Sequence, residues 1–124
     1  MDHSPGFLKL VNESRPRIKE LTVQQARERL AQNPKIVLMD VREDHEWQKG
    51  RAAESIHLSK GILERDLEKM FPDPNTEIIL YCGGGFRSVL AADAAQKMGY
   101  KTVFSLVGGH KAMVQASWPM ELPG

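Results

Sequence analysis

Short apolar stretches and helical repeats of apolar residues alternate along this chain. Stretches of four or five residues that carry β-branched, leucine or aromatic side chains predict strands. They cover residues 18–21, 36–39, 55–58, 77–81 and 102–106. Between them, apolar residues recur every three or four positions, which predicts helices. The helical stretches cover residues 23–32, 43–49, 63–70 and 88–98, and a last helix follows Gly109.

Turn and capping residues divide these stretches at regular intervals. Thr22 with Gln25 three positions later resembles a capping box, Asn33-Pro34 stops the first of these helices, and Gly99 is a C-cap candidate. Strands that alternate with helices predict an α/β fold with a mostly parallel central sheet and helices on both faces. We expect one domain over residues 18–120, preceded by an extended N-terminal arm over residues 1–17.

Composition narrows the class of function. The chain has 124 residues, 41% of them hydrophobic, and 17 basic against 16 acidic residues give a net charge of +1. This balance favours a small-molecule substrate over nucleic acid or a charged membrane as a partner. No apolar run reaches the roughly 18 residues of a membrane span. The single cysteine cannot form an internal disulfide, which fits a reducing cytoplasm.

That cysteine, Cys82, is the strongest candidate for chemistry. It follows the apolar stretch 77–81 and precedes the alanine-rich helical stretch, with three glycines between them: Gly83, Gly84 and Gly85. Free backbone N–H groups and the positive end of a helix dipole converge at such a junction and favour an anion. The thiolate is the nucleophilic form of cysteine, so this setting predicts a reactive thiol.

Two further features favour a reactive cysteine over an inert buried one. Three consecutive glycines lose much conformational entropy on folding, which is tolerable where the backbone takes unusual torsions or approaches a ligand. Arg87 adds a positive charge that can bind an anionic group through two parallel hydrogen bonds.

These motifs make the chain resemble a single-domain rhodanese, a sulfurtransferase acting on thiosulfate. The resemblance covers about residues 18–120 and rests on Asp40-Val41-Arg42-Glu43, Glu46-Trp47 with Gly50, Tyr81-Cys82 through Arg87-Ser88, and Val107-Gly108-Gly109. It implies that Cys82 accepts a sulfane sulfur as a persulfide, and that Gly83, Gly84, Gly85, Phe86 and Arg87 form the cradle for it. We expect no cofactor, and the spacing of His45, His57 and His110, without partner cysteines, argues against a zinc site. Where the family continues after the glycine with His and then Ile-Pro-Gly-Ala, this chain has Arg51-Ala52-Ala53-Glu54-Ser55.

Loop length separates the alternatives. Cysteine-dependent phosphatases and arsenate reductases place five residues between Cys and Arg, whereas four lie between Cys82 and Arg87. The shorter loop favours one sulfur atom over a tetrahedral phosphate ester. A binding or sulfur-sensing module with the same fold is the other alternative. Asp40 and Arg42 are expected to form a charged pair that supports the rim of the site rather than to act in catalysis.

The resemblance and the lone cysteine also bear on partners. We expect a small sulfur donor, an external acceptor that is cyanide, a thiol or a protein, and a monomer or weak homodimer. No second cysteine is present to receive sulfur within the chain.

Overall fold

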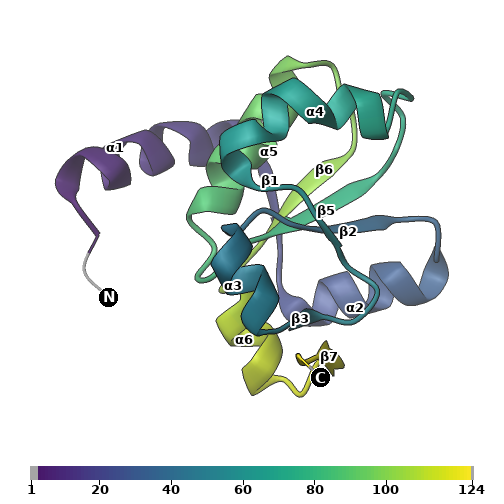
Figure 1. Cartoon of the computed structure of the whole chain (residues 1–124). Coiled ribbons are helices and arrows are strands. Elements are labelled where there is room, and N and C mark those ends of the chain that lie inside the picture. The colour runs from purple at the N-terminus through teal and green to yellow at the C-terminus, as the bar shows by residue number, and fades with distance from the viewer. Residues whose placement is uncertain (1–2, 124) are drawn as a thin grey trace.

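The computed structural model describes residues 3–123 and has a five-stranded parallel sheet at its centre (Figure 1). The strand order is β1-β6-β5-β2-β4, so β5 lies in the middle of the sheet. The strands are β1 (Lys19–Leu21), β2 (Val37–Asp40), β4 (Ile56–His57), β5 (Ile78–Tyr81) and β6 (Val103–Leu106). Two further short strands, β3 (Arg51–Ala52) and β7 (Met120–Glu121), pair antiparallel outside this sheet.

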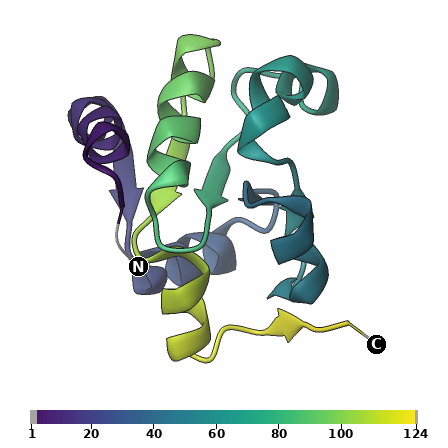
Figure 2. The same cartoon turned by 60° about the vertical axis from the view of Figure 1, so that its left-hand side comes forward.

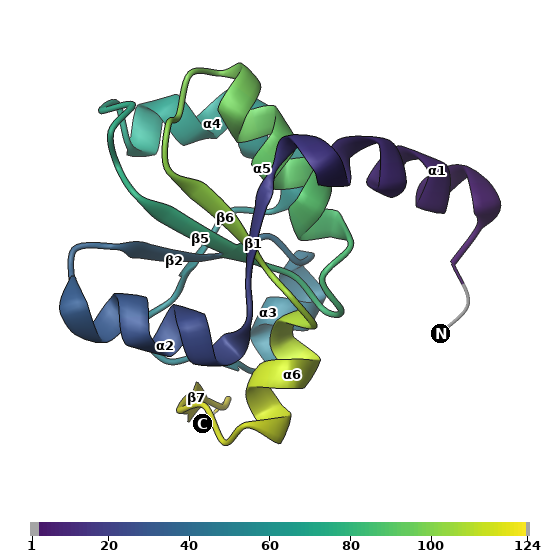
Figure 3. The same ribbon diagram turned by 180° about the vertical axis from the view of Figure 1, so that it is seen from behind.

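Helices cover both faces of the sheet, which confirms the predicted α/β fold. The helices are α1 (Pro5–Ser14), α2 (Val23–Gln32), α3 (Asp44–Lys49), α4 (Leu63–Met70), α5 (Arg87–Lys97) and α6 (Gly109–Gln115), with 3-10 turns at Arg15–Arg17 and Lys60–Ile62. In Figure 1, α4 and α5 lie above the sheet and α2 and α6 lie below it, and Figure 3 shows the same two layers from behind.

The alternation of side chains along β5 explains these two layers. Ile78 and Leu80 pack with α4 and α5 in one apolar cluster, whereas Ile79 and Tyr81 pack with α2 and α6 in another. All four are fully buried, as expected for a central parallel strand covered on both faces. Cys82 continues the alternation and belongs to the α4–α5 side.

Local signals in the sequence correspond to observed helix ends. The hydroxyl of Thr22 accepts a hydrogen bond from the N–H of Gln25, and the Gln25 side chain accepts one from the N–H of Thr22. This confirms the capping box that begins α2, and Asn33 follows its last residue. Helix α3 ends at Lys49 before Gly50, and α5 ends two residues before Gly99.

The N-terminal segment is the main departure from expectation. Residues 5–14 form helix α1 instead of an extended arm, and α1 packs beside α5 (Figure 2). Pro5 stands in the first turn, where its missing N–H costs nothing, and Val11 is fully buried against the rest of the protein. Tertiary packing on α5 therefore stabilises a helix too short to be stable alone.

Candidate active site

The sulfur of Cys82 lies at the amino end of α5, where it accepts hydrogen bonds from the helix. The N–H of Gly85 is 3.2 Å and that of Ser88 is 3.4 Å from Sγ. No side chain caps α5, so the sulfur takes the place of a capping oxygen. Cys82 is only 1% exposed. Negative charge on this sulfur would be stabilised by two N–H donors and by the helix dipole.

A buried pair of hydroxyls lies behind the sulfur. The Ser88 hydroxyl is 3.5 Å from Sγ and 2.8 Å from the hydroxyl of Ser105 on β6. Both serines are fully buried, so their hydroxyls find partners only in one another and in the cysteine. Sequence reasoning did not assign them a role. The available signal was a serine inside the buried stretch of β6, where a lone polar residue requires a partner.

Only one glycine of the loop needs glycine's conformational freedom. Gly85 has a φ of +93°, and a Cβ there would lie 2.9 Å from the backbone nitrogen of Gly108. At Gly84, φ is not positive and a Cβ would meet nothing nearer than the Phe86 ring at 3.8 Å. At Gly83, a Cβ would lie 3.0 Å from Nη2 of Arg87. The three positions therefore differ in why they require glycine, and the requirement is weakest at Gly84.

Helix α6 supports the loop from below. The N–H groups of His110 and Lys111 donate to the carbonyls of Cys82 and Gly83, at 2.7 and 3.1 Å. Gly109 has a φ of +53°, and a Cβ on it would overlap the carbonyl oxygen of Cys82. The close approach of α6 fixes the peptide planes of Cys82 and Gly83 and thereby the start of the loop.

Arg87 is held by a carboxylate that the sequence analysis did not assign to the site. Its two terminal nitrogens donate to the two oxygens of Glu46 at 2.7 and 3.0 Å. These bonds lower the pKa of Glu46 from its ordinary value of 4.5 to about 2. Glu46 also accepts from the N–H of Glu43, which fixes it at the start of α3. The pair lies over Gly83, so Arg87 stands at the loop with its charge largely balanced.

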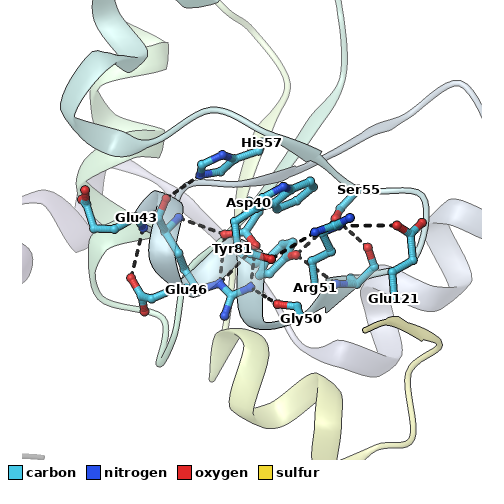
Figure 4. A network of polar contacts seen from close by, with 12 residues as sticks. Asp40, Glu43, Glu46, Gly50, Arg51, Ser55, His57, Tyr81 and Glu121 are labelled. Atoms are coloured by element: carbon cyan, nitrogen blue, oxygen red, sulfur yellow. Dashed lines mark hydrogen bonds and ion pairs between the residues drawn. The ribbon is translucent and has the colours of Figure 1, made fainter. Parts of the chain in front are cut away.

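Asp40, at the end of β2, and Arg42 form a buried ion pair. The guanidinium donates to both Asp40 oxygens, the shortest bond being 2.8 Å, and to the carbonyl of Gly50 at 2.7 Å. Both residues are at most 5% exposed. Within residues 3–123, Arg42 forms no hydrogen bond to the Cys82–Arg87 loop. The pair fixes the turn after α3, part of the network in Figure 4.

The Tyr81 hydroxyl secures the same turn from the sheet. It accepts from the N–H of Ala52 at 3.1 Å and lies 3.2 Å from the Ser55 hydroxyl, as Figure 4 shows. Burial raises the pKa of this phenol above its ordinary value of 10, so it stays protonated. The segment that departs from the rhodanese pattern is therefore anchored to the strand that carries Cys82.

Comparison with known proteins identifies the family. Residues 22–116 match the family described as Rhodanese-like domain. The chain belongs to this family. The match begins directly after β1, ends directly after α6, and includes the Cys82 loop, Glu46 and the Asp40–Arg42 pair.

Relatives of this rhodanese-like domain include sulfurtransferases. The "putative sulfurtransferase" YtwF of Bacillus subtilis is 30% identical over 77% of this chain and 89% of its own length. The thiosulfate sulfurtransferase GlpE of Coxiella burnetii is 34% identical over 60% of this chain and 67% of its own.

Two solved structures resemble the rhodanese-like domain over nearly its whole length. One is a polysulfide-sulfur transferase homodimer from Wolinella succinogenes, with 28% identity, a TM-score of 0.78, and coverage of 94% of this chain and 87% of that one. The other is a protein of unknown function, "possible tyrosine phosphatase", from Rhodopseudomonas palustris, with 29% identity, a TM-score of 0.83 and 98% coverage of both chains.

The geometry of this rhodanese-like domain suits covalent chemistry at sulfur. The loop presents N–H donors to the thiol, and within residues 3–123 the N–H groups of Gly84, Phe86 and Arg87 donate to no other group. The described residues contain no group of three side chains able to bind a metal, and none of their helices is long and apolar enough to span a bilayer.

Proposed function

We propose that the protein is a sulfurtransferase that carries a sulfane sulfur on Cys82 and takes it from thiosulfate or a related persulfide or polysulfide donor. The proposal rests chiefly on one observation, the Cys82 sulfur that accepts two N–H groups at the end of α5 inside a loop of four residues. These N–H groups and the helix dipole can stabilise an anionic sulfur.

The first half-reaction forms the persulfide. The Cys82 thiolate attacks the outer sulfur of thiosulfate, the new S–S bond forms, and sulfite leaves with the electron pair of the bond that breaks. The N–H groups of Gly84, Phe86 and Arg87, which within residues 3–123 donate to no other group, are the donors that we assign to the transferred sulfur. Arg87 uses two of its five N–H donors on Glu46 and keeps the others for the anionic donor.

The second half-reaction requires an acceptor from outside the chain. Cyanide or a thiolate attacks the outer sulfur of the persulfide, and the electron pair of the S–S bond returns to Cys82. The products are thiocyanate or a new persulfide, and no oxidant or reductant is consumed. Because Cys82 is the only cysteine, an internal thiol cannot take over the sulfur. A free thiol of this kind suits a reducing compartment such as the cytoplasm.

Mass spectrometry of the intact protein tests the proposal. Incubation with thiosulfate should add one sulfur atom to the chain, on Cys82, and a reductant should remove it. Cys82→Ser should abolish loading while the protein stays folded. The same measurement with polysulfide in place of thiosulfate shows which of the two donors loads Cys82. GlpE is a thiosulfate sulfurtransferase and the Wolinella protein is a polysulfide-sulfur transferase, so both donors are tested.

A parallel assay with an aryl phosphate addresses the rival reaction, prompted by the description of the Rhodopseudomonas protein. The protein should hydrolyse the phosphate ester negligibly, because the four-residue loop between Cys82 and Arg87 is too small for three phosphoryl oxygens. Phosphatase turnover without sulfur loading would refute the sulfurtransferase proposal. Absence of both reactions would leave a binding module as the function of this fold.

A further inference from the structure

The N-terminal segment contacts the active-site loop through a cluster of aromatic rings. The ring of Phe86, within the loop, lies 4.4 Å from that of His3 and 6.4 Å from that of Phe7, centroid to centroid. His3 and Phe7 contact each other at 5.3 Å. All three side chains are half-buried, and the guanidinium of Arg15 lies 5.9 Å from the centre of the Phe86 ring. Residues before the rhodanese-like match at 22 therefore touch the loop that carries the chemistry.

The opposite end of α1 is fixed to α5 by charge. Asp93 of α5 accepts from the hydroxyl of Ser14 at 3.1 Å and from Arg17 at 3.1 and 2.9 Å. The bonds from Arg17 hold the pKa of Asp93 well below its ordinary value of 3.8, so the carboxylate stays charged. The N-terminal segment is thus attached to α5 through Ser14 at the end of α1 and Arg17 in the following 3-10 turn, and to the loop through the rings of His3 and Phe7. Figure 2 shows α1 beside α5.

Phe86 is the loop residue whose ring contacts the N-terminal segment. It stands between Gly85 and Arg87 and is the N-cap residue of α5. The N–H donors on either side of it, those of Gly85 and Ser88, point at the Cys82 sulfur. The three preceding residues are glycines without side chains. The ring of Phe86 is therefore the side chain through which the N-terminal segment can hold this part of the loop.

We infer that His3 and Phe7 are positioning residues for sulfur transfer. They hold the ring of Phe86 and thereby keep the Gly85 and Ser88 N–H groups aimed at the sulfur. The catalytic part of this inference rests on the proposed function, whereas the mechanical part concerns the loop alone. Helix α1 then belongs to the active site, although it lies outside the residues that match the family.

Amide hydrogen exchange in the full-length chain tests the mechanical part directly. Phe7→Ala and His3→Ala should each accelerate exchange at Gly85 and Ser88 by about two- to tenfold, the amount one aromatic pair supplies. Leu10→Ala is the matched control, because Leu10 lies on the same helix, is 55% exposed and carries no aromatic ring. Phe7→Tyr keeps the ring and should restore slow exchange.

Steady-state kinetics with thiosulfate test the catalytic part. In Phe7→Ala, kcat should fall by a similar factor while KM changes less, because the donors that hold the transferred sulfur are displaced. Equal exchange at Gly85 in Phe7→Ala and Leu10→Ala would overturn the inference. So would faster exchange that extends equally to the amides of β5, because that pattern reports general destabilisation.

The two proposals fail in different ways. A wild-type protein that never loads sulfur refutes the proposed function, yet the exchange comparison between Phe7→Ala and Leu10→Ala still decides the role of α1. Normal loading with unchanged exchange in Phe7→Ala refutes the role of α1 alone.

Discussion

Replacing Gly109 by alanine should impair the active site by displacing the Cys82 loop, although the residues of the loop stay unchanged. The added Cβ would overlap the Cys82 carbonyl oxygen and lie 3.0 Å from the carbonyl carbons of Cys82 and Gly83. To reach ordinary contact, the loop must retreat by about 1 Å. That movement strains the bonds from His110 and Lys111, each contributing about 0.5–1.5 kcal/mol.

Gly99→Ala provides the matched control for this change. Both glycines have positive φ, +53° at Gly109 and +107° at Gly99, which costs an alanine about 1–2 kcal/mol. A Cβ on Gly99, however, meets nothing within 4 Å. We therefore expect a loss of about 1–2 kcal/mol in unfolding free energy for Gly99→Ala and about 2–5 kcal/mol for Gly109→Ala.

The two variants should differ more in activity than in stability. A displacement of about 1 Å in a reacting group can cost about a hundredfold in rate, so Gly109→Ala should load sulfur about a hundred times more slowly. Gly99→Ala should load sulfur at the wild-type rate. Urea denaturation gives the stabilities, and time-resolved mass spectrometry with thiosulfate gives the loading rates. Wild-type loading in Gly109→Ala, or equal slowing in both variants, would refute the role assigned to the close contact.

Within the loop itself, Gly85→Val should lower stability by about 1–3 kcal/mol and activity by about a hundredfold or more, because φ is positive and the N–H bonds the sulfur. Gly84→Val should stay within tenfold of wild type in the same unfolding and loading assays, and equal losses in the two variants would contradict the geometry. Arg87→Ala should raise KM for thiosulfate with a smaller change in kcat, and Arg87→Lys should recover only part of the loss because lysine lacks the fork; an unchanged KM in Arg87→Ala would remove it from donor binding. The lowered pKa of Glu46 predicts that its stabilising contribution is fully present above pH 4.5 and is lost as the pH falls toward 2, so the stability difference between wild type and Glu46→Gln in urea unfolding should shrink over that range. A difference that stays constant from pH 7 to pH 2 would show that the Glu46 pair does not stabilise the fold.

The parts of the fold that the sequence predicted are those with local signals. The capping box at Thr22 and the buried stretch that became β5 are set by residues close together in the chain. Helix α1 was missed because its ten residues include Gly6 and Asn12, and its stability comes from packing on α5. The two-residue strands β3 and β7 are too short to show a periodic pattern.

The same difference between local signals and long-range contacts applies to the active site. The junction of strand, glycines and helix marked Cys82, since all its parts are adjacent in sequence. The Glu46–Arg87 pair joins residues 41 positions apart, and Ser105 reaches the cysteine only through the pairing of β6 with β5. Neither has a local pattern. Equally, nothing in the glycine run distinguishes Gly84 from Gly85, because the difference depends on the approach of Gly108.

The backing of the Cys82 loop by α6 has a consequence for the order of folding. The carbonyls of Cys82 and Gly83 receive their N–H donors from His110 and Lys111, and β1 pairs with β6 near the other end of the chain. Contacts between such distant segments close large loops and form slowly. The loop that carries the thiol is therefore complete only once α6 has packed against it. A growing chain that ends before Gly109 already contains Cys82 and the loop up to Arg87, but not the N–H groups of His110 and Lys111 that hold the start of this loop.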